Sequence, residues 1–158
     1  MENASPLVIT ISRQLGSGGG YIGQQLAKRL DIFYADREII SLAAQHFSML
    51  EKDLASRDEK KLSFWQSFIR THAAAPDAYV KPQTLPPSDH ELFKAESGII
   101  LRIARERPAV IIGRCGAHVL RSHPNCVSIF LHADRAFRID RVMKLYNTTE
   151  EAAGKIID

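Results

Sequence analysis

The chain has 158 residues, of which 45% are hydrophobic and 25% charged; this is typical of one globular domain and not of a disordered or fibrous chain. Its 21 basic and 18 acidic residues give a net charge of +3, which is too small to indicate nucleic-acid binding. No apolar run approaches the length of a membrane span and no basic leader is present, so we expect neither membrane insertion nor secretion. The two cysteines lack Cys-x-x-Cys spacing, which favours reduced thiols in a cytoplasmic protein.

Four segments have the character of buried strands: residues 7–12, 32–35, 109–112 and 127–131. Each is a short run with apolar or β-branched residues at both parities, as expected where both faces of a parallel sheet are covered. Apolar residues at helical spacing lie between these runs. The alternation predicts an α/β fold with a mainly parallel sheet in three layers, and ligands bind such sheets beyond the carboxyl ends of the strands.

Residues 41–107 form a predicted helical insert between the second and third strands. Four prolines lie within residues 74–88, and an exposed loop of this length is typical of a functional flap or a disordered insert. Capping-box patterns at Ser48–Glu51 and Ser88–Glu91 predict two helix starts. Near the end of the chain, Thr148 with Glu151 predicts the start of a last helix.

A glycine-rich segment, Gly16 to Gly20, joins the first strand to the helix that follows it. Glycines allow backbone amides to approach an anion closely, with the positive end of a helix behind them. Four glycines in five residues exceed what a tight turn needs. The segment therefore predicts a phosphate-binding loop formed by Gly16, Ser17, Gly18, Gly19 and Gly20.

The type of nucleotide is less clear from the loop. Gly18, Gly20 and Gly23 match the Gly-x-Gly-x-x-Gly pattern, and Asp36 ends the next strand, as in a dinucleotide-binding Rossmann protein. The longer connection before the glycines suits a P-loop better. No lysine follows Arg13 until after the loop, however, so the complete P-loop pattern is absent. Arg13 could supply the charge of that lysine to the phosphates.

Further motifs appear in chain order with this loop, and together they resemble the cytidylate kinase-like family, a branch of the P-loop nucleoside monophosphate kinases. The resemblance covers most of the chain apart from residues 48–90. It rests on Ile9–Arg13, Gly16–Gly19, Phe33–Ile40, Val110–Arg114, and Ile129–Ala133 ahead of an arginine-containing helix.

The resemblance implies transfer of the γ-phosphoryl group of ATP, with Mg²⁺, to a nucleoside monophosphate. An arginine-rich site suits this reaction, because phosphoryl transfer needs alignment and charge neutralisation and the planar guanidinium grips phosphate in two places. By position, the resemblance assigns Gly16 to Gly20 to the donor phosphates and Asp36, Arg37 and Arg114 to the acceptor nucleotide. It assigns Arg114, Arg138 and Arg141 to catalysis. Arg138 and Arg141 belong to a partial lid over residues 132–158.

The sequence lacks several residues with which the family binds phosphate and magnesium. Gly19 stands in the place of the Walker lysine, and Tyr21 in that of the magnesium-binding Ser or Thr. Ile112 to Cys115 replace the Asp-Gly-Arg-Asp of cytidylate kinases, so neither the magnesium ligands nor a preference for cytosine can be inferred. A non-catalytic nucleotide-binding protein is therefore the alternative function.

Simpler interpretations stand beside several of these assignments. Asp36 could cap the next helix, and Arg138 could pair with Asp134 on the surface. Cys115 is expected to be a small buried residue. Two histidines, His118 and His123, are not expected to bind a metal.

The expected partners are nucleotides, and neither nucleic acid nor membrane. The resemblance also implies a fifth strand after Asp158. The chain is then either truncated, or a second copy in a homo-oligomer covers the exposed edge of the sheet.

Overall fold

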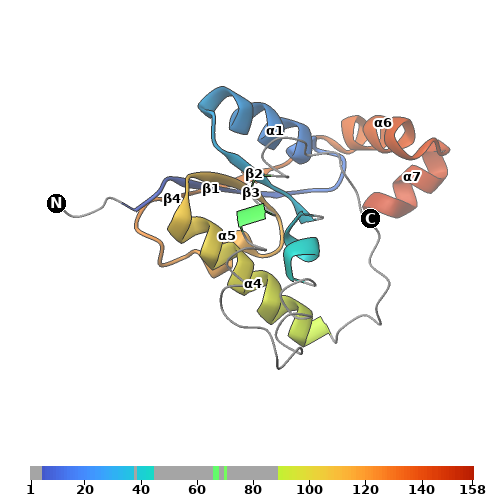
Figure 1. Ribbon diagram of the computed structural model, residues 1–158. Helices are drawn as coiled ribbons and strands as arrows, with labels where there is room; N and C mark the ends of the chain where they lie inside the picture. Colours follow the sequence, from blue (N-terminus) through green and yellow to red (C-terminus); the bar gives the residue numbers. More distant parts are fainter. Residues whose placement is uncertain (1–4, 38, 45–65, 68–69, 71–88) are drawn as a thin grey trace.

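The computed structural model describes residues 5–37, 39–44, 66–67, 70 and 89–158. The proline-rich loop at 74–88 and the capping box at Ser48–Glu51 lie outside the described residues, as does most of the predicted insert at 41–107. Figure 1 shows the described parts in sequence colours.

The centre of the fold is a parallel sheet of four strands in the described part of the chain. The strands are β1 (Val8–Arg13), β2 (Phe33–Ala35), β3 (Ala109–Ile112) and β4 (Cys126–Leu131), in the spatial order β2-β3-β1-β4. Ile11 of β1 is in register with Ile112 on one side and Ile129 on the other. The carboxyl ends of the three neighbouring strands β3, β1 and β4 therefore meet at one edge of the sheet, as the sequence predicted.

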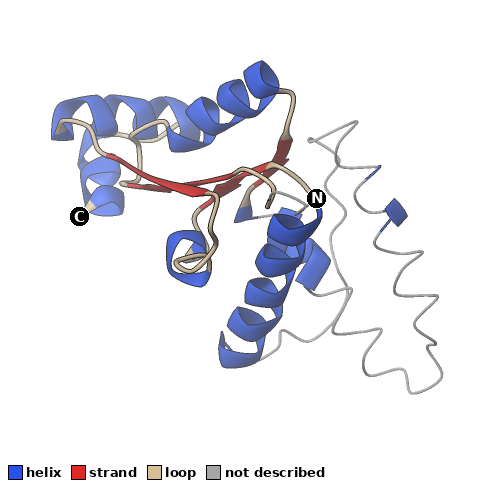
Figure 2. Ribbon diagram, turned by 90° about the vertical axis from the view of Figure 1, so that its left-hand side faces the viewer, coloured by secondary structure: helices blue, strands red, loops and turns tan. Residues whose placement is uncertain are grey.

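Helices cover both faces of the sheet, which gives the three layers seen in Figures 1 and 2. Side chains of a strand point alternately to opposite faces, so Ile9 and Ile11 pack with Ala27 of α1 (Gly19–Leu30). On the other face, Val8 packs in a core with α4 (Asp89–Glu106), α5 (Gly116–Val119) and the helical residues 39–44. The prediction of a three-layer α/β fold is confirmed, and α4 begins within the predicted Ser88–Glu91 box.

The prediction that residues 127–131 form a strand is correct, but the prediction that this strand is buried is wrong. Val127 is 49% exposed and Phe130 is 62% exposed. The reason is topological: β4 is the last strand of the described sheet and pairs on one side only, with β1. The expectation that a homo-oligomer covers this edge stays a prediction.

Helices α6 (Arg135–Tyr146) and α7 (Glu150–Ile157) follow β4 and lie beyond the carboxyl ends of the strands (Figure 1). They pack on each other through a small core of Ile139, Val142 and Ala153. The cap of α7 is Thr149, whose side chain accepts a hydrogen bond from the backbone N–H of Ala152. The prediction of Thr148 was wrong by one residue: Thr148 lies between the two helices and gives its backbone N–H to the Met143 carbonyl at the end of α6.

None of the helices in the described ranges is long and apolar enough to span a bilayer.

Candidate functional site

The glycine loop between β1 and α1 is held at its base by Gln14. The backbone N–H of Gln14 donates to the Leu131 carbonyl at the end of β4, and its side-chain oxygen accepts from the backbone N–H of Ala133. Ser17 is buried and its hydroxyl donates to the Gln14 carbonyl at 2.8 Å. Gly16 and Gly18 have φ values of +84° and +87°, a region that side chains disfavour and glycine adopts freely. The loop is thus fixed against the ends of two strands.

The amino end of α1 presents backbone amides with no competing acid. Gly18 is the N-cap residue and provides no side-chain cap, and no acidic residue lies in the first turn. The first amides of a helix have no partner within it and carry a partial positive charge. Arginines add full charges here: Arg13 packs against Gly19, and Arg141 places its guanidinium near Gly18. This end of α1 therefore has the electrostatics of an anion site.

Helix α6 closes on the loop at Arg138. A Cβ atom added to Gly16 would lie 2.7 Å from the carbonyl oxygen of Arg138, so only glycine permits this approach. The Nε atom of Arg138 is buried and has no hydrogen-bond partner in the described part of the chain. The alternative of an ion pair with Asp134 is not found among the described residues.

A second turn at the carboxyl edge follows β3. Gly113, Arg114 and Cys115 have φ values of +70°, +50° and +55°, and left-handed backbone at non-glycine residues costs energy that tends to be retained at functional sites. The turn leads into α5, with Cys115 as its N-cap residue. Cys115 is exposed, so the expectation that it is buried was wrong. The left-handed turn directs it away from the sheet, into the cavity described below.

Arg114 is held by two residues from different helices. Its Nε lies 3.2 Å from Oε1 of Glu96 in an ion pair, and its Nη2 donates to the Ser41 hydroxyl at 3.1 Å. The Ser41 hydroxyl in turn donates to the same Glu96 oxygen at 2.6 Å. Glu96 is only 2% exposed. A carboxylate is rarely buried to this extent unless it is paired, and here Arg114 is the paired cation.

Sequence reasoning missed Glu96, although a signal was present. On α4 it lies three and four residues from Phe93, Leu92, Ile99 and Ile100, so it interrupts the apolar stripe of an amphipathic helix. A charged residue on such a stripe must find a buried partner. The missing information was the identity of that partner, because nothing in the sequence links α4 to the turn after β3.

A cavity of about 510 Å³ brings several predicted residues together. Arg37 and Arg114, both predicted to bind the acceptor, line it with Arg13, which was predicted to bind the donor phosphates. The Arg13 side chain crosses Gly19 and its guanidinium reaches Gly113, so it links the glycine loop to this cavity. The lining consists of Arg13, Arg37, Leu92, Phe93, Glu96, Arg114 and Cys115.

Asp36 caps the helix that follows it, and its predicted place at the acceptor nucleotide stays a prediction. Its Oδ1 accepts a hydrogen bond from the backbone N–H of Ile39 at 3.1 Å, and its carbonyl accepts from Ile40. This is the geometry of a helix cap, and Asp36 is not among the residues that line the cavity. The predicted site residues thus divide into a glycine-loop group with Arg138 and Arg141, a cavity group, and Asp36 at a helix start.

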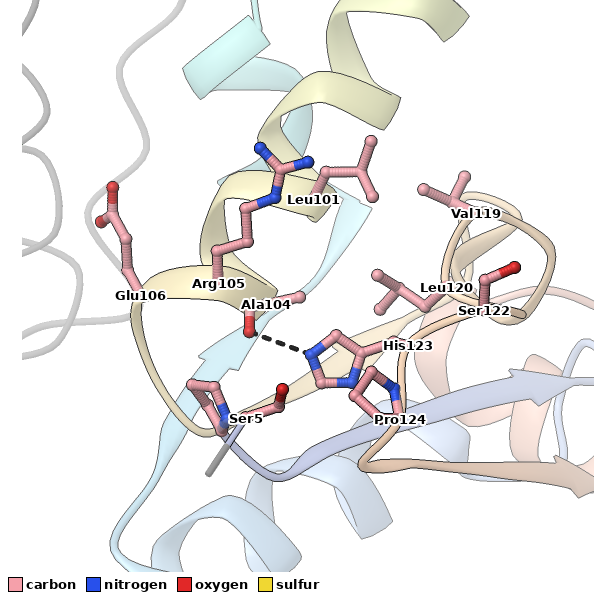
Figure 3. A pocket seen from close by; sticks show the side chains of 11 residues that line it. Ser5, Leu101, Ala104, Arg105, Glu106, Val119, Leu120, Ser122, His123 and Pro124 are labelled. Atoms are coloured by element: carbon pink, nitrogen blue, oxygen red, sulfur yellow. Dashed lines mark hydrogen bonds between the residues drawn. The ribbon is translucent and has the colours of Figure 1, made fainter. Parts of the chain in front are cut away.

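A second cavity of about 580 Å³ lies between the end of α4 and the α5–β4 connection (Figure 3). It is at the amino ends of the strands, since Ser5 and Pro124 on its wall precede β1 and β4. His123 uses both ring nitrogens there, Nε2 with the Ala104 carbonyl at 3.2 Å and Nδ1 with the backbone N–H of Asn125. These bonds give His123 a structural role. Among the described residues no group of three His, Cys, Asp or Glu side chains gathers as metal ligands do.

The parallel sheet with helices on both faces and a glycine loop before α1 defines an α/β protein of the predicted three-layer class. The chain belongs to the cytidylate kinase-like family, whose model matches residues 8–158. The resemblance seen in the sequence is thereby confirmed.

Solved structures resemble this chain to different degrees. An uncharacterized protein from Eubacterium ventriosum is 21% identical, with a TM-score of 0.65 over 96% of this chain and 68% of its own. A gluconokinase from Sinorhizobium meliloti is 14% identical, with a TM-score of 0.49 over 96% of this chain and 73% of its own. A search among curated proteins returned no match.

Proposed function

We propose that the protein transfers the γ-phosphoryl group of ATP to a nucleoside monophosphate. The observation that carries the proposal is the cavity in which Arg13, Arg37 and Arg114 converge beside the glycine loop. Three guanidinium groups and one carboxylate, Glu96, give this cavity an excess of positive charge that suits a phosphate dianion. Membership of the cytidylate kinase-like family supports a kinase-like role that involves nucleotides.

In this proposal, Gly16 to Gly20 bind the donor phosphates through the amides at the start of α1. Arg138 and Arg141, which lie against the loop, neutralise charge on the transferred group. The buried Nε of Arg138 has no partner among the described residues, and in this proposal a bound phosphate supplies one. Arg13 takes the place of the missing lysine charge between the two nucleotides. Positioning and charge neutralisation of this kind supply most of the catalysis in phosphoryl transfer.

Magnesium does not fit the described residues as a protein-bound ion. Tyr21 stands where the family has its metal-binding hydroxyl, and its side chain is 60% exposed. The nearby Ser17 side chain is buried, with its hydroxyl donating to the Gln14 carbonyl. Mg²⁺ prefers oxygen ligands from carboxylates, water and substrate phosphates. We therefore derive no step through a metal held by the protein, and the ion would arrive with ATP.

The second candidate function is nucleotide binding without turnover, and one contact favours it. A Cβ atom at Gly19 would lie 2.8 Å from Cγ of Arg13, so the loop as packed has no room for a lysine at this position. A fold that has lost this lysine could keep the glycine cradle for binding alone. A dinucleotide-binding function remains the third interpretation.

The test is release of ADP from ATP with Mg²⁺ across CMP, dCMP, UMP, AMP and GMP. We expect turnover with at least one of them, reduced at least about 100-fold by Arg114→Lys, because a lysine cannot make the two-pronged contact of arginine. Arg121→Lys is the matched control, since Arg121 is exposed and contacts His118 away from the cavity. Its activity should equal that of the wild type.

Thermal unfolding separates the alternatives. A nucleotide at about 100 times its Kd should stabilise the protein by about 2.7 kcal/mol. Stabilisation by ATP with no turnover on any monophosphate would reject the kinase and support the binding protein. Stabilisation by NAD and not by ATP would support the dinucleotide interpretation, and no shift with any of these ligands would reject all three.

A further inference from the structure

We infer that Glu96 and Ser41 form a clamp that positions Arg114 for the acceptor phosphate, an inference that rests on the proposed function. The clamp is defined by three contacts: Glu96 Oε1 with Arg114 Nε at 3.2 Å, Ser41 Oγ with Arg114 Nη2 at 3.1 Å, and Ser41 Oγ with Glu96 Oε1 at 2.6 Å. Glu96 and Ser41 are positioning residues in this scheme, and Arg114 is the group that meets the phosphate.

The contacts use one edge of the guanidinium. A guanidinium carries five N–H donors in a fixed plane. Nη2 donates to Ser41, and Nε, on the same edge, lies 3.2 Å from Glu96 in the ion pair but makes no hydrogen bond among the described residues. The N–H groups of the opposite edge stay available to an anion. The Arg114 side chain is one-quarter exposed and borders the cavity, whereas that of Glu96 is nearly inaccessible. The clamp thus holds the inner edge and leaves the outer edge for a ligand.

The placement of the clamp also argues for a role beyond packing. Arg114 follows Gly113 at the end of β3, and its backbone has a left-handed φ of +50°. Ser41 and Glu96 lie at the two ends of the segment between β2 and β3, 55 residues apart in sequence. Both ends of that segment therefore meet at the guanidinium. A misplacement of such a group by about 1 Å can lower a reaction rate about 100-fold.

The Glu96 carboxylate has two opposing effects on phosphate binding, which makes the inference testable. It orients Arg114, which favours binding. Glu96 adds negative charge to the cavity and by charge alone weakens the binding of a phosphate. If charge dominated, Glu96→Gln would lower the KM for the acceptor. If positioning dominates, as we infer, the same variant raises that KM and lowers kcat, because Arg114 loses its fixed orientation.

The experiment compares Glu96→Gln, Ser41→Ala and the double variant with the wild type. We expect kcat/KM for the nucleoside monophosphate to fall about 10- to 100-fold in Glu96→Gln, less in Ser41→Ala, and no further in the double variant than in Glu96→Gln. The KM for ATP should change less, because none of the described glycine-loop residues Gly16 to Gly20 lines the cavity that Glu96 and Arg114 border. Glu106→Gln is the matched control on the same helix, where Glu106 pairs with Arg102 on the surface, and it should keep wild-type kinetics.

A measurement without nucleotide keeps the inference separate from the proposed function. Carbon-13-detected NMR of the guanidinium, assigned with Arg114→Lys, reports how freely the Cζ–Nε bond of Arg114 rotates. We expect slow rotation in the wild type and fast rotation in Glu96→Gln, with added inorganic phosphate shifting the wild-type signal more. These results would support the clamp even if no monophosphate were a substrate. Fast rotation in the wild type, or a lowered acceptor KM with unchanged kcat in Glu96→Gln, would overturn it. Ser41→Ala gives the same readouts should Glu96→Gln fail to fold.

Discussion

Arg13 and Gly113 are in contact across the carboxyl ends of two neighbouring parallel strands. Nη1 of Arg13 occupies the space that a side chain on Gly113 would need. The backbone of Gly113 also has a φ of +70°, and its N–H is bonded to the Ile11 carbonyl of β1 at 3.0 Å. The absence of a side chain at this one position thus lets the arginine from β1 extend into the cavity after β3.

Gly113→Ala should therefore be harmful in two ways. The left-handed φ is unfavourable for alanine, and the methyl group would displace the Arg13 guanidinium from the cavity. We expect a loss of about 1–3 kcal/mol in the free energy of unfolding, measured by denaturant titration. Phosphate or nucleotide binding should weaken further, because Arg13 no longer reaches the cavity.

The matched control for that substitution is Gly98→Ala. Gly98 lies in the interior of α4, and a Cβ atom there would have no neighbour within 4 Å among the described residues. Alanine in an exposed helix interior should stabilise the protein by about 0.5–1 kcal/mol. Equal effects of the two substitutions would show that the contact between Arg13 and Gly113 has no energetic importance.

The glycine loop offers a second comparison, between Gly16 and Gly18. Both have a left-handed φ, so alanine is strained at either position. Only at Gly16 would the new Cβ also press on the α6 backbone, 2.7 Å from the Arg138 carbonyl; at Gly18 the nearest atom, of Arg141, is 3.6 Å away. We expect Gly16→Ala to destabilise by about 1–3 kcal/mol more than Gly18→Ala, as measured by the midpoints of chemical unfolding. A larger loss in Gly18→Ala would contradict the packing of α6 on the loop.

The sheet could be predicted from the sequence because its signals are local. The runs that became β1 and β3 are apolar at both parities, and the glycines at 16–20 lie where a strand passes into a helix. The same local signal misled at β4, whose apolar residues look buried while Val127 and Phe130 are exposed. Apolar content identifies a strand, but its position in the sheet is set by pairing with other segments.

The site shows the same limit. Arg114 could be singled out because Gly113 and a buried strand precede it. The Glu96–Arg114 pair could not, because its members belong to elements joined only by tertiary packing. The path of the Arg13 side chain could not be predicted from the sequence either. It passes Gly19 and reaches Gly113, where only glycine leaves room for it. Cys115 was wrongly expected to be buried for a related reason: its exposure follows from a left-handed turn at a non-glycine residue.

The start of α7 gives a prediction that separates two adjacent threonines. The Thr149 hydroxyl caps the helix through the Ala152 N–H, whereas Thr148 contributes its backbone N–H to the end of α6. Thr149→Ala should cost about 1 kcal/mol of stability, as loss of a cap usually does, and Thr148→Ala should cost clearly less. Thermal unfolding of the two variants gives the comparison, and the reverse order would reject Thr149 as the cap.

The ion pair between Arg135 and Asp158 makes the packing of α6 on α7 dependent on pH. Nη2 of Arg135 lies 2.8 Å from Oδ2 of Asp158, and the hydrogen bond from Arg135 lowers the pKa of Asp158 below its ordinary value, aided by the positive charge. The same bond raises the pKa of Arg135, which stays charged at any practical pH. The stabilisation is therefore complete above the ordinary pKa of Asp158 and is lost as the pH falls through its lowered pKa in the folded state.

Asp158→Asn should remove this dependence. The wild type should be slightly more stable than the variant at neutral pH and equal to it in strong acid, with a small difference because the pair is exposed. The difference should also shrink in high salt, which screens exposed charges. Denaturant midpoints of both proteins at several pH values, in low and high salt, measure it. A difference that persists unchanged into strong acid would mean that Asp158 contributes through packing and not through its charge.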